Sequence, residues 1–135
     1  TTPAAAQTPA PASGPALDPN GSPGQTAAEA LAQSGVEKLE RGDLGGARID
    51  VDAALLQAPG SARYERLKAR ILSTEGNHQG ALDVLNQAVA HDGRNPEVYR
   101  QRAASLMALG DDRGAARNMQ AAERLANGTA PTSPP

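Results

Sequence analysis

Three arginines, Arg63, Arg66 and Arg70, have the spacing that points most directly to chemistry. Residues at i, i+3 and i+7 share one face of a helix. A guanidinium group pairs with a carboxylate through two parallel hydrogen bonds, so this face could hold an acidic segment or a terminal carboxylate. The alternative is a solvated face on which the arginines pair with glutamates of the same chain. The glutamates in that alternative are Glu29, Glu65 and Glu97.

The other reactive side chains form no catalytic or metal-binding pattern. Cysteine is absent, which excludes disulfides, zinc–thiolate sites and cysteine nucleophiles. His78 and His91 are too far apart in the sequence to suggest a pair of metal ligands. Asp50 and Asp52 point to different sides of a helix, so they do not form a carboxylate pair for acid–base catalysis. We predict that the protein is not an enzyme and needs neither cofactor nor metal.

The composition favours closely packed helices over a conventional globular core. The chain has 135 residues, a formal net charge of -2 and two aromatic residues, Tyr64 and Tyr99. Much of its hydrophobic fraction is alanine, which suits close contacts between helices. The net charge gives no general affinity for nucleic acid, and no apolar run approaches the roughly 18 residues that span a bilayer. We expect a protein partner, and neither a nucleic acid nor a small-molecule substrate.

A fixed spacing organises the middle of the chain. Gly42, Gly76 and Gly110 lie 34 residues apart. Alanines follow them at constant offsets, as Ala47, Ala81 and Ala115 and again as Ala54, Ala88 and Ala122. A period of this length indicates a solenoid of stacked helix pairs. Each glycine would close a helix in the left-handed conformation, and the Asp or Asn after it would cap the next helix.

Six helices are expected, and no alternating pattern predicts a strand. The first helices of the pairs are expected at 26–41, 61–75 and 95–109, and the second helices at 44–57, 78–91 and 112–126. Pro59 and Pro96 fall at the junctions between repeats. The fold class is therefore all-α.

This sequence resembles the tetratricopeptide repeat (TPR) family, whose unit is 34 residues in two antiparallel helices. The residues that carry the resemblance are Gly42, Leu44, Ala47, Val51, Ala54, Leu55 and Pro59, then Ala69, Leu72, Gly76, Ala81, Leu85 and Ala88, and then Tyr99, Ala103, Leu106, Gly110, Ala115, Met119 and Ala122. The resemblance implies an α-solenoid of three antiparallel helix-turn-helix repeats, at 28–61, 62–95 and 96–129. The repeat domain, 26–129, is expected to lie between a disordered Pro/Ala-rich tether, 1–25, and a disordered tail, 130–135.

Two kinds of departure from the pattern carry expectations. Glu65 and Lys38 stand where the family has bulky apolar residues, which predicts weaker packing and modest stability. Near the end of the last repeat, Glu123 and Arg124 stand where the first repeat has Leu55 and Leu56. Charge at these places is typical of a capping repeat and predicts a monomer. Random surface drift is the alternative.

In TPR arrays the first helices line a concave face, and residues at fixed offsets on them meet the partner. Carried over position by position, the resemblance implies partner-binding residues Arg63, Arg66, Arg70, Arg100, Val36, Leu39, Asn95 and Met107. The carboxylate clamp of chaperone-binding TPR domains is not reproduced, because Ala32 and Val36 stand where it requires polar side chains. The expected ligand is an acidic or amphipathic segment of a partner protein.

The Pro/Ala-rich lead before a short array resembles bacterial envelope proteins, including lipoproteins. This likeness predicts an assembly factor of a bacterial envelope, pilus or secretion machine. Its place would be the periplasm or the outer membrane, reached through a lipid anchor since removed. The alternatives are a cytosolic secretion chaperone or adaptor in the cytoplasm, and a self-assembling structural scaffold.

Overall fold

The computed structural model describes residues 23–128, which fold into helices joined by short turns. The six helices are α1 (Pro23–Glu40), α2 (Leu44–Gln57), α3 (Ala62–Thr74), α4 (His78–His91), α5 (Pro96–Ala108) and α6 (Asp112–Ala126). The second helix of each pair has the predicted bounds. Of the first helices, α1 begins earlier than predicted, at Pro23, which fits because a proline is favoured at the first position of a helix. The predicted disordered segments lie almost wholly outside the described residues.

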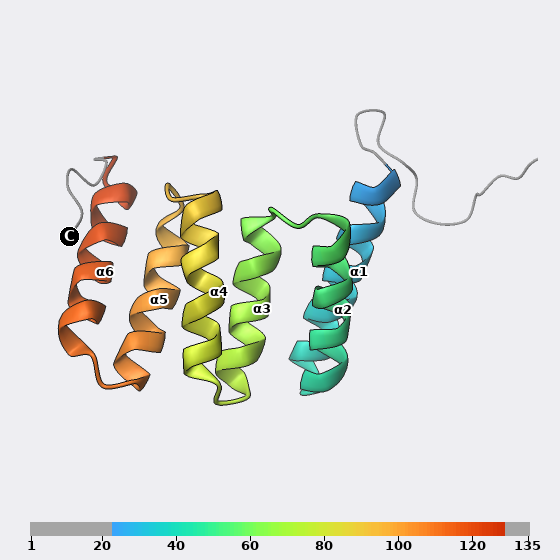
Figure 1. Ribbon diagram of the computed structural model, residues 1–135, viewed down its shortest axis with the longest axis horizontal. Coiled ribbons are helices and arrows are strands. Elements are labelled where there is room, and N and C mark those ends of the chain that lie inside the picture. The colour runs from blue at the N-terminus through green and yellow to red at the C-terminus, as the bar shows by residue number, and fades with distance from the viewer. Residues whose placement is uncertain (1–22, 129–135) are drawn as a thin grey trace, which may run out of the picture.

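The helices follow one another in a row from α1, which lies behind α2 in this view, to α6 (Figure 1). Each helix packs against the next along the chain, most extensively within the pairs α1–α2, α3–α4 and α5–α6. The first helices also contact one another, α1 with α3 and α3 with α5, whereas α2 and α4 make no such contact. The first helices therefore pack together along one face of the row, which we call the inner face.

The turns inside the pairs repeat the same backbone geometry. Gly42, Gly76 and Gly110 have φ angles of 85°, 88° and 89°, a region that residues with a side chain rarely adopt. Apart from the glycine itself and its two chain neighbours, no residue has an atom within 4 Å of the place that a Cβ would take on any of the three. The caps of the following helices are Asp43, Asn77 and Asp111, each accepting a hydrogen bond from a backbone N–H three residues on. Both predicted turn signals are confirmed.

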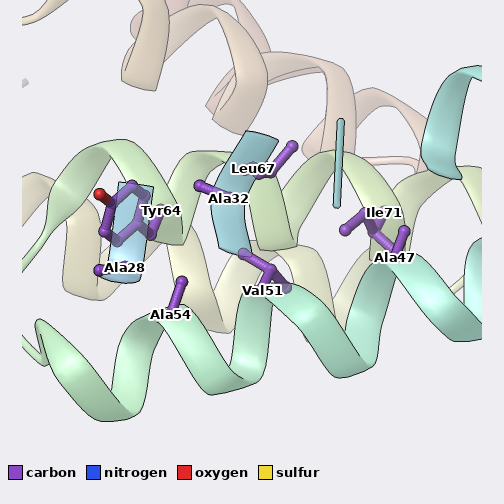
Figure 2. Packing of buried hydrophobic residues seen from close by; sticks show 8 residues of the cluster. All are labelled: Ala28, Ala32, Ala47, Val51, Ala54, Tyr64, Leu67 and Ile71. Atoms are coloured by element: carbon purple, nitrogen blue, oxygen red, sulfur yellow. The ribbon is translucent and has the colours of Figure 1, made fainter. Parts of the chain in front are cut away.

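Small side chains dominate the core. Figure 2 shows the first core cluster gathered between α1, α2 and α3: Ala28, Ala32, Ala47, Val51, Ala54, Tyr64, Leu67 and Ile71. The second core cluster lies between the later helices and consists of Ala69, Leu72, Ala81, Leu85, Ala88 and Val98. Few of the fully buried side chains are large, and Ile71 and Leu85 are the largest of them. Alanine contacts bring the helices close together, while these few branched side chains fill the remaining space.

Lys38 does not leave the packing gap that the sequence suggested. Its Nζ lies 3.0 Å from Oδ2 of Asp50 on α2, and the Ser34 hydroxyl donates a 2.6 Å hydrogen bond to the same oxygen. Asp50 is only 9% exposed. A buried carboxylate with two donors on α1 thus replaces an apolar contact between the two helices. Asp52, on another side of α2, pairs instead with Lys68 of α3.

The Asp50 carboxylate makes stability depend on pH. The hydrogen bond from Ser34, and after it the charge and hydrogen bond of Lys38, hold the pKa of Asp50 below its ordinary value of 3.8. The resulting stabilisation is present above pH 3.8 and is lost as pH falls through the lowered pKa. We expect Asp50→Asn to reduce the free energy of unfolding by about 1–2 kcal/mol at neutral pH. Urea titrations should show this gap narrowing below about pH 4.

The exposed Asp83 on α4 provides the control for this prediction. Asp83→Asn should have the same free energy of unfolding as the wild type, both at neutral pH and below about pH 4. A gap between wild type and Asp50→Asn that stays constant from neutral pH to about pH 3 would show that Asp50 does not titrate differently in the folded state.

Glu65 is also paired and leaves no gap. It is 3% exposed, and its Oε1 lies 2.9 Å from Nδ1 of His91 at the end of α4. The neighbouring Tyr64, 5% exposed, supplies the bulky core side chain at this level. Glu65 is thus a partner of His91 and not of the arginines, so this element of the solvated-face alternative is wrong.

The end of the array is polar at one of the two positions that the sequence suggested. Glu123 is exposed, whereas Leu55 at the equivalent place is partly buried against the first core cluster. Leu56, by contrast, is 83% exposed. Its position faces solvent already in the first repeat, so Arg124 at the equivalent place does not mark a cap. The capping prediction therefore depends on Glu123 alone.

Candidate partner-binding groove

A hollow of about 180 Å³ lies on the inner face between α1 and α3. Its lining residues are Ala32, Val36, Arg63, Tyr64, Arg66, Leu67 and Arg70. The structure thus brings together four of the predicted site residues, the three arginines of α3 and Val36 of α1. We call this hollow the α1–α3 groove.

The α1–α3 groove has an apolar floor and a cationic rim. Ala32, Tyr64 and Leu67 belong to the first core cluster and form the floor. Arg63 and Arg70 are exposed, and Arg66 is half-buried between them. Sequence reasoning missed Tyr64 and Leu67 as lining residues because they read as core positions. They are core positions whose outer surface also borders the groove.

Arg63 is paired within the chain, as the solvated-face alternative predicted for it. Its guanidinium forms an ion pair with Glu29 of α1 and lies over the ring of Tyr64, 5.7 Å from the centroid. The Tyr64 hydroxyl donates to Oε1 of the same glutamate at 3.3 Å. Burial, and after it the charge of Glu29, raise the pKa of Tyr64. Glu29 therefore holds two donors at one end of the groove.

Arg66 and Arg70 differ from Arg63 because neither forms an ion pair with any residue from 23 to 128. Nε of Arg66 is also buried without a hydrogen-bond partner there. Like charges at i and i+4 on a helix repel one another. An anion bound between the two guanidinium groups would relieve this repulsion.

The other four predicted site residues lie outside the α1–α3 groove. Leu39 packs against the first core cluster, and Asn95 caps α5 by accepting a hydrogen bond from the N–H of Glu97 at 2.9 Å. Arg100 pairs with the carboxylate of Glu97 at 2.6 Å. Met107 is 63% exposed on α5. A role in partner binding stays a prediction for these four residues.

Two further properties of the described residues bear on the kind of site. Between residues 23 and 128, no group of three or more His, Cys, Asp or Glu side chains is placed to hold a metal ion. No helix in this part of the chain is long and apolar enough to cross a membrane.

No family model and no curated protein matches the sequence. Solved structures do match the row of helices. The first TPR domain of Spaghetti (RPAP3), bound to an HSP90 peptide, has a TM-score of 0.74 at 18% identity, covering 76% of this chain and 82% of that chain. The TPR2B domain of yeast Sti1, in a complex with pHsp70, has a TM-score of 0.73 at 22% identity, with the same coverage.

The chain has the tetratricopeptide-repeat fold.

A third structure, MamA, matches this TPR array with a TM-score of 0.72 at 14% identity, covering 77% of this chain. The TPR array spans 61% of the MamA chain. At these identities the likeness shows the fold, and the peptides in the two complexes are ligands of those proteins. The resemblance predicted from glycine and alanine spacing is confirmed at the level of three stacked helix pairs.

Proposed function

We propose that this TPR array is a protein–protein interaction module that holds an acidic, partly apolar segment of a partner in the α1–α3 groove. The observation that carries the proposal is the pair Arg66 and Arg70, which line the groove and have no ion pair within residues 23–128. Two uncompensated guanidinium groups beside an apolar floor match a carboxylate flanked by an apolar side chain.

The TPR fold supports this proposal because stacked helix pairs create extended concave surfaces that hold other chains. Guanidinium–carboxylate pairs supply orientation as well as affinity, since the planar groups meet through two hydrogen bonds. Ala32, Val36 and Leu67 would contact the apolar part of the ligand.

As the wider role, we propose an assembly factor of a bacterial envelope, pilus or secretion machine. The support for it is the Pro/Ala-rich composition of residues 1–25. A precursor with a signal peptide ending in a lipidated cysteine would support this placement, whereas a plain cytoplasmic start would favour the cytosolic adaptor. The exposed charge of Glu123 disfavours end-to-end stacking in a structural scaffold. Self-association in analytical ultracentrifugation would favour the scaffold instead.

We expect the double variant Arg66→Glu and Arg70→Glu to lose binding to acidic peptides. The full chain would first select peptides from a random displayed library, and the selected peptides should be enriched in Asp and Glu. Because a hydrogen bond to a charged group contributes about 1.5–3 kcal/mol, reversing two such groups should weaken binding by about 100-fold or more. Fluorescence polarisation with a labelled selected peptide measures this change.

The matched control reverses two arginines away from the groove. Arg113 and Arg117 are exposed on α6 at the same i, i+4 spacing. Changing both to Glu alters the net charge equally, and binding should stay within about threefold because distant exposed charges are screened by salt. Selection of peptides without acidic residues, or equal binding by the two double variants, would exclude the α1–α3 groove as the acidic-ligand site.

A further inference from the structure

The α1–α3 groove contains two arginine subsites in different states. The first subsite, which we call the closed subsite, consists of the Arg63 guanidinium and the Tyr64 hydroxyl, both engaged by Glu29. The second, which we call the open subsite, consists of Arg66 and Arg70, which have no ion pair among the described residues. The two subsites are adjacent on α3, since Arg63 and Arg66 are one helical turn apart.

Glu29 occupies the closed subsite as an acidic ligand would. Both of its carboxylate oxygens accept hydrogen bonds from Nη1 of Arg63, and Oε1 also accepts from the Tyr64 hydroxyl. The carboxylate comes from α1, across the groove from the arginines. A ligand carboxylate at this position would need the same donors, so it must displace Glu29 before it gains them.

We propose that Glu29 is an internal competitor that sets how many ligand carboxylates the groove recognises. This inference depends on the proposed function, because it concerns the acidic ligand of the same groove. With Glu29 in place, the described residues of the α1–α3 groove offer one free carboxylate subsite, between Arg66 and Arg70. A second ligand carboxylate exchanges one ion pair for another at Arg63 and gains little affinity.

The exposure of this ion pair makes the exchange feasible. The side chains of Arg63 and Glu29 are 63% and 47% exposed, and ion pairs between exposed groups contribute little to stability. Glu29 can therefore leave Arg63 without disturbing the fold. Glu29 differs in this from Asp50 on the other helix of the same pair, whose side chain is buried.

The test compares two labelled, C-terminally amidated peptides on the full chain. Both carry one leucine, and they differ in having one glutamate or two glutamates in a Glu-Xaa-Glu arrangement. Residues i and i+2 of an extended peptide lie on the same side, about 7 Å apart, which the long side chains of Arg63 and Arg66 can span. Fluorescence polarisation then gives the affinity of each peptide for the wild type and for Glu29→Gln.

We expect the wild type to bind the two peptides within about threefold of one another. Glu29→Gln should bind the two-glutamate peptide about tenfold more tightly than the wild type does, because the second carboxylate now gains the Arg63 contact in full. Its affinity for the one-glutamate peptide should change by less than about threefold. Adding Arg63→Ala to Glu29→Gln should abolish the tenfold gain.

Glu37→Gln is the control for net charge, since Glu37 is exposed on the same helix and does not line the groove. It should leave the preference between the peptides unchanged. If the wild type binds acidic peptides but Glu29→Gln shows no added preference for two glutamates, the role of Glu29 is wrong and the proposed function stands. If neither peptide binds the wild type or Glu29→Gln, the proposed function fails and the inference with it.

Discussion

Replacing Leu85 with alanine is expected to lower the free energy of unfolding by about 2–5 kcal/mol. Leu85 is 1% exposed on α4 and belongs to the second core cluster. Its neighbours there include Ala69, Ala81 and Ala88. Their methyl side chains are too short to fill the cavity that the substitution leaves. Since domains of this kind have a total stability of about 5–15 kcal/mol, the loss is a large share of it.

A urea titration followed by circular dichroism measures this loss. Leu56→Ala is the matched control, because it removes the same atoms from a side chain that is 83% exposed. It should change the free energy of unfolding by no more than about 0.5 kcal/mol. Equal effects of the two substitutions would show that the second core cluster is not packed as described.

Replacing His91 with alanine is expected to lower the free energy of unfolding by about 1–3 kcal/mol. The reason is that Glu65, 3% exposed, would keep its carboxyl group in the interior of the α3–α4 pair without the hydrogen-bond partner at 2.9 Å. A buried polar group without a hydrogen-bond partner destabilises the folded state, because nothing replaces the hydration that it loses on folding.

Two further variants separate this explanation from a general effect of histidine removal. His78→Ala removes the imidazole from the first residue of α4. It should change the free energy of unfolding by no more than about 0.5 kcal/mol. The double change Glu65→Leu with His91→Leu should recover most of the loss, since replacing both partners of a hydrogen bond by apolar side chains can be nearly neutral. Failure of the double change to exceed His91→Ala in stability would contradict the explanation.

The fold was predictable because its signals are local. Gly42, Gly76 and Gly110 each follow the end of one helix and stand directly before the cap of the next, so two adjacent residues mark both boundaries. The bounds of α2, α4 and α6 followed directly. The predicted start of α1, at residue 26, was too late, because Pro23 can belong to a proline-rich lead or to the first turn of a helix.

The pairing of charged residues was not predictable from one-helix periodicity. The arginine face of α3 is visible in the sequence, but Glu29 lies on α1, so the arginine that it neutralises depends on how two repeats stack. For the same reason, Lys38 and Glu65 read as defects. Their partners, Asp50 and His91, lie on the second helix of each pair, and only the packed pair brings them together.

Gly42, Gly76 and Gly110 have a consequence that concerns chirality rather than packing. Their φ angles are positive, yet no atom stands where a Cβ would be. Space would therefore permit a side chain, and the strain on an L residue comes only from its configuration. A D residue would take the same φ without that strain. In each turn between the two helices of a pair, the backbone takes a φ angle that suits a D residue better than an L residue. Glycine is achiral and adopts positive and negative φ angles about equally well.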